Sequence, residues 1–120
     1  AMDFMFYGTS SFNNDISSWD VSRVTNMKAM FEKASSLNQD ISSWDVSSVA
    51  DMYYMFSKAS SFNQTLCAWG CKLITSPSPI MSDMSADMMF DSTSCPSVTV
   101  ILDLKSDPPG PFCYECKSPC

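Results

Sequence analysis

The sequence predicts an α/β solenoid: a stack of about three to four 25-residue strand–turn–helix units with a disulfide-rich C-terminal cap. Three observations lead to this prediction. Residues 10–34 recur, with few changes, as residues 35–59. Within each copy, apolar side chains spaced by two residues are followed by others spaced by three and four. All six cysteines lie between positions 67 and 120, where the repeat loses its regularity.

The positions that the period keeps constant are apolar. A third copy begins at Ser60 and then diverges. Because one such unit is too small to bury its own apolar face, we expect successive units to stack and to cover one another. The recurring sets are Met2, Met27 and Met52; Met5, Met30 and Met55; Phe6, Phe31 and Phe56; Phe12, Leu37 and Phe62; Ile16, Ile41 and Leu66; Trp19, Trp44 and Trp69; Val21, Val46 and Cys71; and Val24, Val49 and Ile74.

A short strand is expected where tryptophan and valine lie two residues apart, as in Trp19 and Val21 or Trp44 and Val46. In a stack, these strands would form a parallel sheet along one side, with a spacing of about 4.8 Å. About two turns of helix should follow, because the next apolar residues recur at steps typical of one helical face. That face comprises Met27, Met30, Phe31 and Ala34, and Thr25 or Asn26 can cap its N-terminus.

Stacking would also align polar residues into ladders. Asn13, Asn38 and Asn63 should lie above one another and satisfy backbone groups of the loops. Aspartates at two further repeat positions must be exposed, hydrogen-bonded or bridged by a cation, because stacked like charges repel. Calcium would suit them, but no known calcium-loop pattern is present, which favours aspartates that cap turns. We therefore expect no metal and no cofactor. These aspartates are Asp15 with Asp40 and Asp20 with Asp45.

The chain divides into a repeat region, residues 1–94, and a Cys- and Pro-rich C-terminal cap, residues 95–120. The expected units span about 1–11 (partial), 12–36, 37–61 and 62–94, the last with a nine-residue insertion. Prolines and glycine exclude a helix or an inner strand from most of the cap. The β-prone run 98–104 could pair within its own chain or with a neighbour, and the sequence leaves both open.

The cysteines predict disulfides and an oxidising, extracellular compartment, since an even number clusters where the apolar core runs out. Zinc is the alternative, because Cys113 and Cys116 have ligand spacing, but a second matching pair is missing. Six cysteines allow fifteen pairings, and the sequence does not choose among them. The candidates are Cys67, Cys71, Cys95, Cys113, Cys116 and Cys120.

The first unit starts partway through the repeat, so Met2, Met5 and Phe6 have no preceding unit to cover them. Either further repeats of a longer parent chain or another subunit would cover these residues. A head-to-tail contact between subunits can propagate into a filament. We therefore expect a homo-oligomer, a filament or a longer repeat array, with these three residues as interaction candidates.

Charge and composition exclude several classes of function. A net charge of −6 argues against nucleic acid and against anionic membrane surfaces. The longest apolar run, residues 98–102, is too short to insert across a membrane. The chain contains no histidine and no phosphate-binding glycine loop, and its paired carboxylates recur with the period as structural residues do. No enzyme is expected.

The units "FNNDISSWDVSRVTNMKAMF" and "LNQDISSWDVSSVADMYYMF" closely resemble BspA-like leucine-rich-repeat surface proteins of microalgal and bacterial type. The spacing Ile16-x-x-Trp19-x-Val21 resembles the leucine-rich-repeat core. The likeness covers about residues 2–66, and "LCAWG", "SCP" and "GPFCYEC" resemble closing segments of such arrays. Cys71, Cys120 and the insertion depart from the pattern. The resemblance implies an extracellular or cell-surface protein of adhesion or protein interaction, without a defined ligand.

The expected function is that of an extracellular or cell-surface structural protein that self-associates or joins a filament or matrix. The alternative is an adhesin-type module that binds a protein or glycan through exposed positions of the stack. Asn63-Gln64-Thr65 is an N-glycosylation acceptor pattern, so Asn63 is a glycosylation candidate. The candidate positions for the adhesin-type surface are Ser18, Asp20, Ser43 and Asp45.

Overall fold

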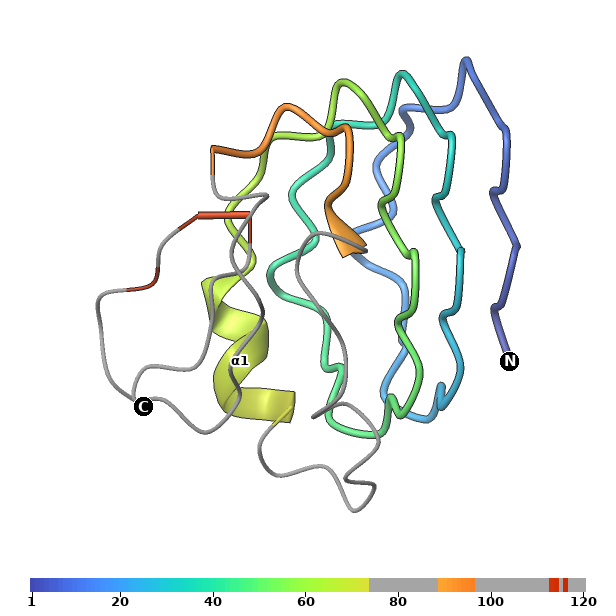
Figure 1. Cartoon of the computed structure of the whole chain (residues 1–120). Coiled ribbons are helices and arrows are strands. Elements are labelled where there is room, and N and C mark those ends of the chain that lie inside the picture. The colour runs from blue at the N-terminus through green and yellow to red at the C-terminus, as the bar shows by residue number, and fades with distance from the viewer. Residues whose placement is uncertain (74–88, 97–112, 115, 117–120) are drawn as a thin grey trace.

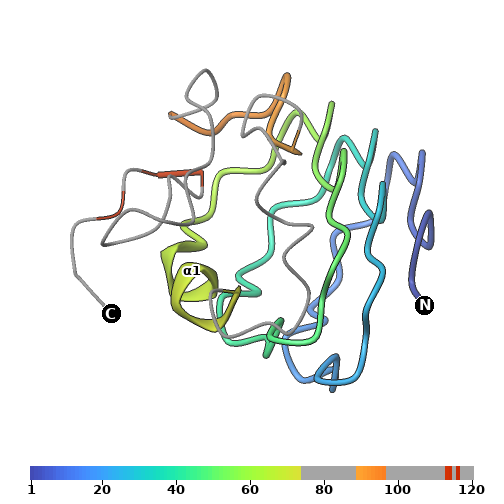
Figure 2. The ribbon, with the colours of Figure 1, turned by 60° about the horizontal axis from the view of Figure 1, so that its bottom comes forward.

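The computed structural model describes residues 1–73, 89–96, 113–114 and 116. These residues form a stack of coils (Figure 1 and Figure 2). We name residues 1–25 coil 1, residues 26–50 coil 2, residues 51–73 coil 3 and residues 89–96 coil 4. The N-terminus lies at one end of the stack, and α1, the helix Cys67–Leu73, lies toward the other.

The prediction of a strand–turn–helix solenoid is wrong. In the part of the chain that the structure describes, α1 is the single helix and no strand is present. One isolated parallel bridge joins Asn26 to Asp51, outside the residues where strands were expected. Residues 27–34 are not helical, and residues 19–21 and 44–46 are not strands. The repeat builds a series of turns instead.

Left-handed backbone conformations explain why no helix forms in residues 27–34. Ala29 has a φ of 53° and Lys33 a φ of 62°, whereas a right-handed helix requires negative φ throughout. Ala29 is the third residue of a turn that the Met30 N–H closes on the Met27 carbonyl over 3.2 Å. The same two repeat positions have positive φ in the other coils, at Phe4, Gly8, Tyr54, Lys58 and Ser92.

Backbone amides at alternate positions bond to the following coil. The amides of coil 2 donate to carbonyls of coil 3 over 2.7–2.9 Å, and those of coil 1 donate to coil 2 in the same way. Between one such amide and the next, the chain makes a turn. These turns produce the spacings of three and four that predicted a helix. The donors are Met2, Phe4, Phe6 and Gly8 in coil 1, and Met27, Ala29, Phe31 and Lys33 in coil 2.

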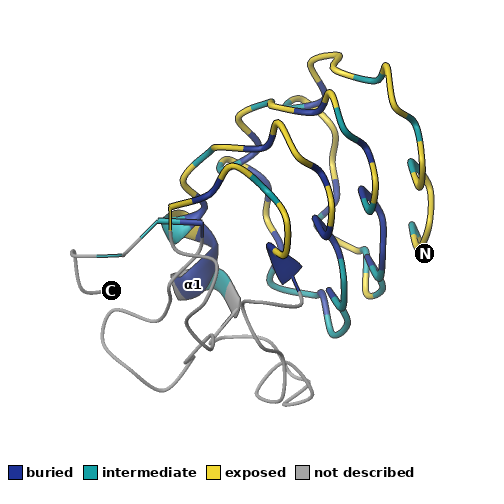
Figure 3. Ribbon diagram, turned by 45° about the horizontal axis from the view of Figure 1, so that its top comes forward, coloured by how far each residue is buried: buried dark blue, intermediate teal, exposed yellow. Residues whose placement is uncertain are grey.

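Aromatic rings form a column through the middle of the stack. Phe6, Phe31, Phe56 and Phe90 follow one another with centroids 5.5, 5.6 and 5.6 Å apart and nearly parallel planes. Repeated apolar side chains fill the space around this column, and the inward-facing parts of coils 2 and 3 are buried (Figure 3). The stack therefore owes its stability to burial between coils rather than to regular secondary structure.

Helix α1 forms where coil 3 departs from the sequence of the first two coils. Thr65 and Gly70 occupy the positions of the turn-forming aspartates of coils 1 and 2. Without those carboxylates the chain is free to continue as a helix, and the Thr65 hydroxyl accepts the N–H of Cys67 over 3.5 Å at its start. None of the described residues belongs to a helix with the length and hydrophobicity that crossing a bilayer needs.

Candidate interaction site

Large apolar side chains are exposed on the outer side of coil 1. Phe4, Met5, Tyr7 and Trp19 are 48%, 47%, 43% and 38% exposed, and Met2 and Phe6 beside them are half-buried. We call these six residues the N-terminal face. The residues at the repeat position of Met5, namely Met30, Met55 and Met89, are all 0% exposed. The exposure of Met5 therefore results from its place at the end of the stack and not from its sequence context.

Trp19 shows which partner this face lacks. The indole N–H of Trp44 donates to the Ile16 carbonyl over 3.0 Å, and Trp69 donates to Ile41 over the same distance. Each tryptophan thus bonds to the isoleucine of the preceding coil. Trp19 holds the same repeat position, and within the described residues its indole N–H has no acceptor.

The sequence prediction named part of this face. Met2, Met5 and Phe6 were expected to be uncovered; Met5 is 47% exposed, whereas Met2 and Phe6 are half-buried against the core. It did not name Phe4, Tyr7 or Trp19. The signal for Trp19 was available, because its repeat position is apolar in every unit, as are the positions of Met5 and Phe6.

The second group of candidate positions, Ser18, Asp20, Ser43 and Asp45, is also exposed. The carboxylates in this group belong to turns, as was predicted. Asp20 accepts the N–H of Ser22 over 3.0 Å and its hydroxyl over 2.6 Å, and Asp45 does the same for Ser47 over 3.1 and 2.7 Å. One oxygen of each carboxylate is therefore occupied within its own coil.

These turns hold the pKa of the aspartates low. The hydroxyl and then the backbone N–H of Ser22 lower the pKa of Asp20 below its ordinary value of 3.8, and Ser47 does the same for Asp45. A carboxyl whose pKa falls on folding adds stability above its unfolded-state pKa, and that stability is lost as the pH drops through the folded-state pKa. Acid should therefore weaken these turns.

We expect thermal stability to fall with acid below about pH 4, and to fall less in a variant carrying Asp20→Asn and Asp45→Asn. Asparagine still accepts the serine N–H but does not titrate. Melting temperatures measured between neutral pH and about pH 2 test this. The variant Ser22→Ala with Ser47→Ala should also flatten the curve, because it removes the hydroxyls that shift the pKa. If the melting temperature falls equally with acid in all three proteins, Asp20 and Asp45 do not account for the loss of stability.

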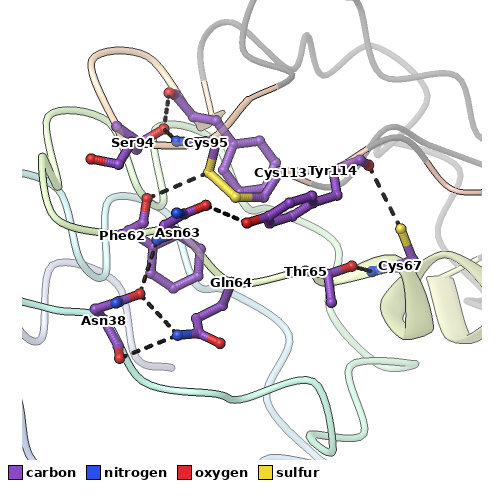
Figure 4. Close-up of a disulfide and its surroundings, with 12 residues drawn as sticks. Asn38, Phe62, Asn63, Gln64, Thr65, Cys67, Ser94, Cys95, Cys113 and Tyr114 are labelled. Carbon is purple, nitrogen blue, oxygen red and sulfur yellow. Dashed lines mark hydrogen bonds between the residues drawn. A yellow bond between two sulfur atoms is a disulfide. The ribbon is translucent and has the colours of Figure 1, made fainter.

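Asparagines at one repeat position form a ladder, in which each hydrogen bond from one coil to the next is a rung. The N–H of Asn38 donates to the Asn13 Oδ1 over 2.8 Å, and the N–H of Asn63 donates to the Asn38 Oδ1 over 2.9 Å. At the last rung, the hydroxyl of Tyr114 donates to the Asn63 Oδ1 over 2.7 Å (Figure 4). Tyr114 therefore takes the place of the backbone amide that a following coil would supply. Sequence reasoning did not identify this role.

Two disulfides hold Tyr114 at this rung. Cys113 is bonded to Cys95 of coil 4, and Cys116 is bonded to Cys67 of α1. We call residues 113–116 the clip, of which Cys113, Tyr114 and Cys116 are described. The side chain of Cys71 and all of Cys120 lie outside the described residues. Because both cysteines of the Cys113-x-x-Cys116 pair are oxidised, neither offers the thiolate that the zinc alternative requires.

Asn63 keeps a free nitrogen for a glycan. Its side chain is exposed, its Oδ1 is taken by Tyr114, and its Nδ2 has no partner among the described residues. Chain expressed through a eukaryotic secretory pathway should therefore carry one N-linked glycan at this position. Intact mass before and after a glycan-releasing amidase, which leaves aspartate, measures it. Thr65→Ala should abolish the shift, and an unglycosylated wild-type chain would contradict the prediction.

The comparisons with known proteins bear on the repeat region. A family model described as "Mycoplasma protein of unknown function, DUF285" matches residues 1–93. The matched range contains coils 1 to 3 and ends before Cys95. Of the four cysteines in the two disulfides, Cys67 lies within the matched range, and Cys95, Cys113 and Cys116 lie beyond it. Searches of curated proteins and of solved structures find no match.

Proposed function

The chain belongs to the family described as Mycoplasma protein of unknown function, DUF285, and on that premise we propose that it is an extracellular or cell-surface structural repeat protein. In this proposal it joins a larger assembly of like coils through its N-terminal face. The resemblance of its repeat to BspA-like surface proteins supports the location. The two clip disulfides also support it, because such bonds persist in oxidising compartments.

The exposure of Trp19 is the observation that carries the proposal. Trp44 and Trp69 are 1% and 0% exposed, and each bonds to the coil before it. Trp19 is 38% exposed. A like coil placed against the N-terminal face would bury its indole and supply the missing carbonyl. Exposed apolar residues gathered on one face are typical of a surface that another protein covers.

The adhesin-type alternative has less support. Its candidate carboxylates, on Asp20 and Asp45, already bond to serines of their own turns. The serines and aspartates at these positions are also not the aromatic and arginine residues that dominate most binding energies. The N-terminal face does contain aromatic residues, and they are of the kind that is buried in the contacts between coils.

The test is an extended chain, in which a copy of residues 1–25 is placed directly before Ala1. The register is kept because Ala1 occupies the repeat position of Asn26. We expect exchange of the Trp19 indole N–H, followed by NMR, to slow by roughly tenfold, which corresponds to a net hydrogen bond of about 1.4 kcal/mol. The exchange rate of the Trp19 indole N–H should then resemble the rates of Trp44 and Trp69.

A control extension of equal length carries Phe6→Ser and Ile16→Ser in the copied unit only. It adds the same length of chain but lacks apolar residues that a coil needs for stacking. Trp19 should stay in fast exchange in this control. If Trp19 also stays in fast exchange in the chain extended with the unaltered copy, the N-terminal face does not accept a like coil and the proposed function is wrong.

A further inference from the structure

We infer that the N-terminal face takes the amide edge of one like coil, and that the opposite end of the stack, which the clip closes, does not take a second copy. The inference rests on the proposed function and goes beyond it, because it specifies which edge of the partner binds and which end of this chain a second copy does not use.

The contacts between coils have a direction. Along residues 2–8 and 27–33, every backbone amide that bonds outside its own coil donates to a carbonyl of the following coil. The carbonyls that accept them, in residues 26–32 and 51–57, all point to the preceding coil. Each coil therefore has an amide edge on one side and a carbonyl edge on the other. The pairs in the first contact are Met2 with Asn26, Phe4 with Lys28, Phe6 with Met30, and Gly8 with Glu32.

The N-terminal face carries the carbonyl edge of coil 1. By their repeat positions, the carbonyls of Ala1, Asp3, Met5 and Tyr7 correspond to those that accept in coils 2 and 3, and none accepts a bond from a described residue. The amides of Met2, Phe4, Phe6 and Gly8 already donate to coil 2. The partner must therefore bring amide donors to this edge.

On the other side of the coil the direction is reversed. There the later coil donates, through the backbone N–H of asparagine and the indole N–H of tryptophan. Coil 1 offers these donors at Asn13 and Trp19, and neither has an acceptor among the described residues. The amide edge of a like coil, with an asparagine Oδ1 and an isoleucine carbonyl on its far side, matches every one of these groups.

A second copy turned to face the first does not match them. Two N-terminal faces in contact would set carbonyl edges against each other or against the donors of Asn13 and Trp19. Neither arrangement supplies the row of backbone amides that pairs with these carbonyls in the contacts between coils. Unpaired carbonyls buried in a contact each cost about 1–3 kcal/mol, so the face-to-face dimer is disfavoured.

The other end of the stack is covered. Trp69, Met89 and Phe90 are all 0% exposed, whereas Trp19 and Met5, at the equivalent positions in coil 1, are 38% and 47% exposed. The Asn63 Oδ1, which a following coil would use, is bonded to Tyr114. A second copy arriving at this end would meet Tyr114, which the two disulfides hold against Asn63, where its own coil would have to lie.

Two measurements test the inference. In sedimentation velocity, the intact chain should remain monomeric at all concentrations, with Trp19 in fast exchange. In the extended chain, Met2→Pro in the copied unit removes an amide donor to the Ala1 carbonyl and should speed Trp19 exchange about fivefold. Asp3→Pro in the copied unit is the matched control. It occupies the second residue of a turn, where proline is favoured, and its amide makes no bond to another coil, so it should leave the rate unchanged.

Three results would overturn the inference. A closed dimer of the intact chain with slowed Trp19 exchange would mean that two N-terminal faces pair. End-to-end oligomers of the intact chain would mean that the clip does not close the stack. Equal effects of the two proline substitutions would mean that amide donors do not direct the contact. Failure of the proposed function looks different, because Trp19 would then remain in fast exchange in the extended chain without any proline.

Discussion

Replacing Trp44 with alanine should destabilise the fold by about 3–5 kcal/mol, a large fraction of the stability of a domain of this size. The side chain is 1% exposed, stacks on Trp69 with centroids 6.4 Å apart and packs at a tilt on Phe31. Alanine would leave a cavity across two coil contacts. It would also remove the indole N–H that the Ile16 carbonyl accepts, so that this carbonyl would keep only the backbone N–H of Trp19. Calorimetric unfolding measures the loss.

Trp19→Ala is the matched control, since it removes the same side chain from the same repeat position. Trp19 is 38% exposed, and its ring contacts Phe6 without a tryptophan on either side. We expect less than half of the destabilisation of Trp44→Ala, because only buried surface contributes. Equal losses would show that the position matters for a reason other than stacking between coils.

The core was predictable from the sequence because burial depends on spacing along a period. Positions such as Met30, Met55 and Ile41 recur as apolar in every unit, and the structure buries them. Which side chains meet is thus determined by the repeat, whatever path the backbone takes between them.

The backbone path was not predictable in this way. Steps of three and four among apolar residues suit a helix, but they also suit a chain that turns between rungs. The difference lies in Ala29 and Lys33, whose left-handed conformations are uncommon for residues with a Cβ and leave no mark in the pattern of hydrophobicity. Gly8 in coil 1, at the position of Lys33, was the one local hint.

The candidate site was predictable at its open end only. Met5 could be named because the repeat starts partway through a unit. Tyr114 could not, because its role depends on disulfide pairing, and six cysteines leave fifteen choices. Its hydroxyl reaches Asn63 across 51 positions of sequence, a contact that no local pattern records.

Removing the clip disulfides should produce the other large loss of stability. In the chain-entropy account, a bond that closes a longer loop restricts the unfolded chain more. Cys67 and Cys116 are 49 positions apart, which corresponds to about 4 kcal/mol, and Cys95 and Cys113 are 18 apart, which corresponds to about 3 kcal/mol. We therefore expect Cys67→Ser with Cys116→Ser to destabilise more than Cys95→Ser with Cys113→Ser, as measured by the urea midpoint.

The two variants should also differ at the last asparagine rung. Cys113 precedes Tyr114 directly and is 0% exposed, so losing its bond to Cys95 frees the segment that positions the tyrosine hydroxyl. Tyr114→Phe removes only that hydroxyl, keeps both disulfides and should cost about 1 kcal/mol. If Cys95→Ser with Cys113→Ser cost no more than Tyr114→Phe, the disulfide would add nothing beyond positioning the tyrosine. If neither changed the urea midpoint, the clip would not stabilise the end of the stack, because closing an exposed core must raise the free energy of unfolding.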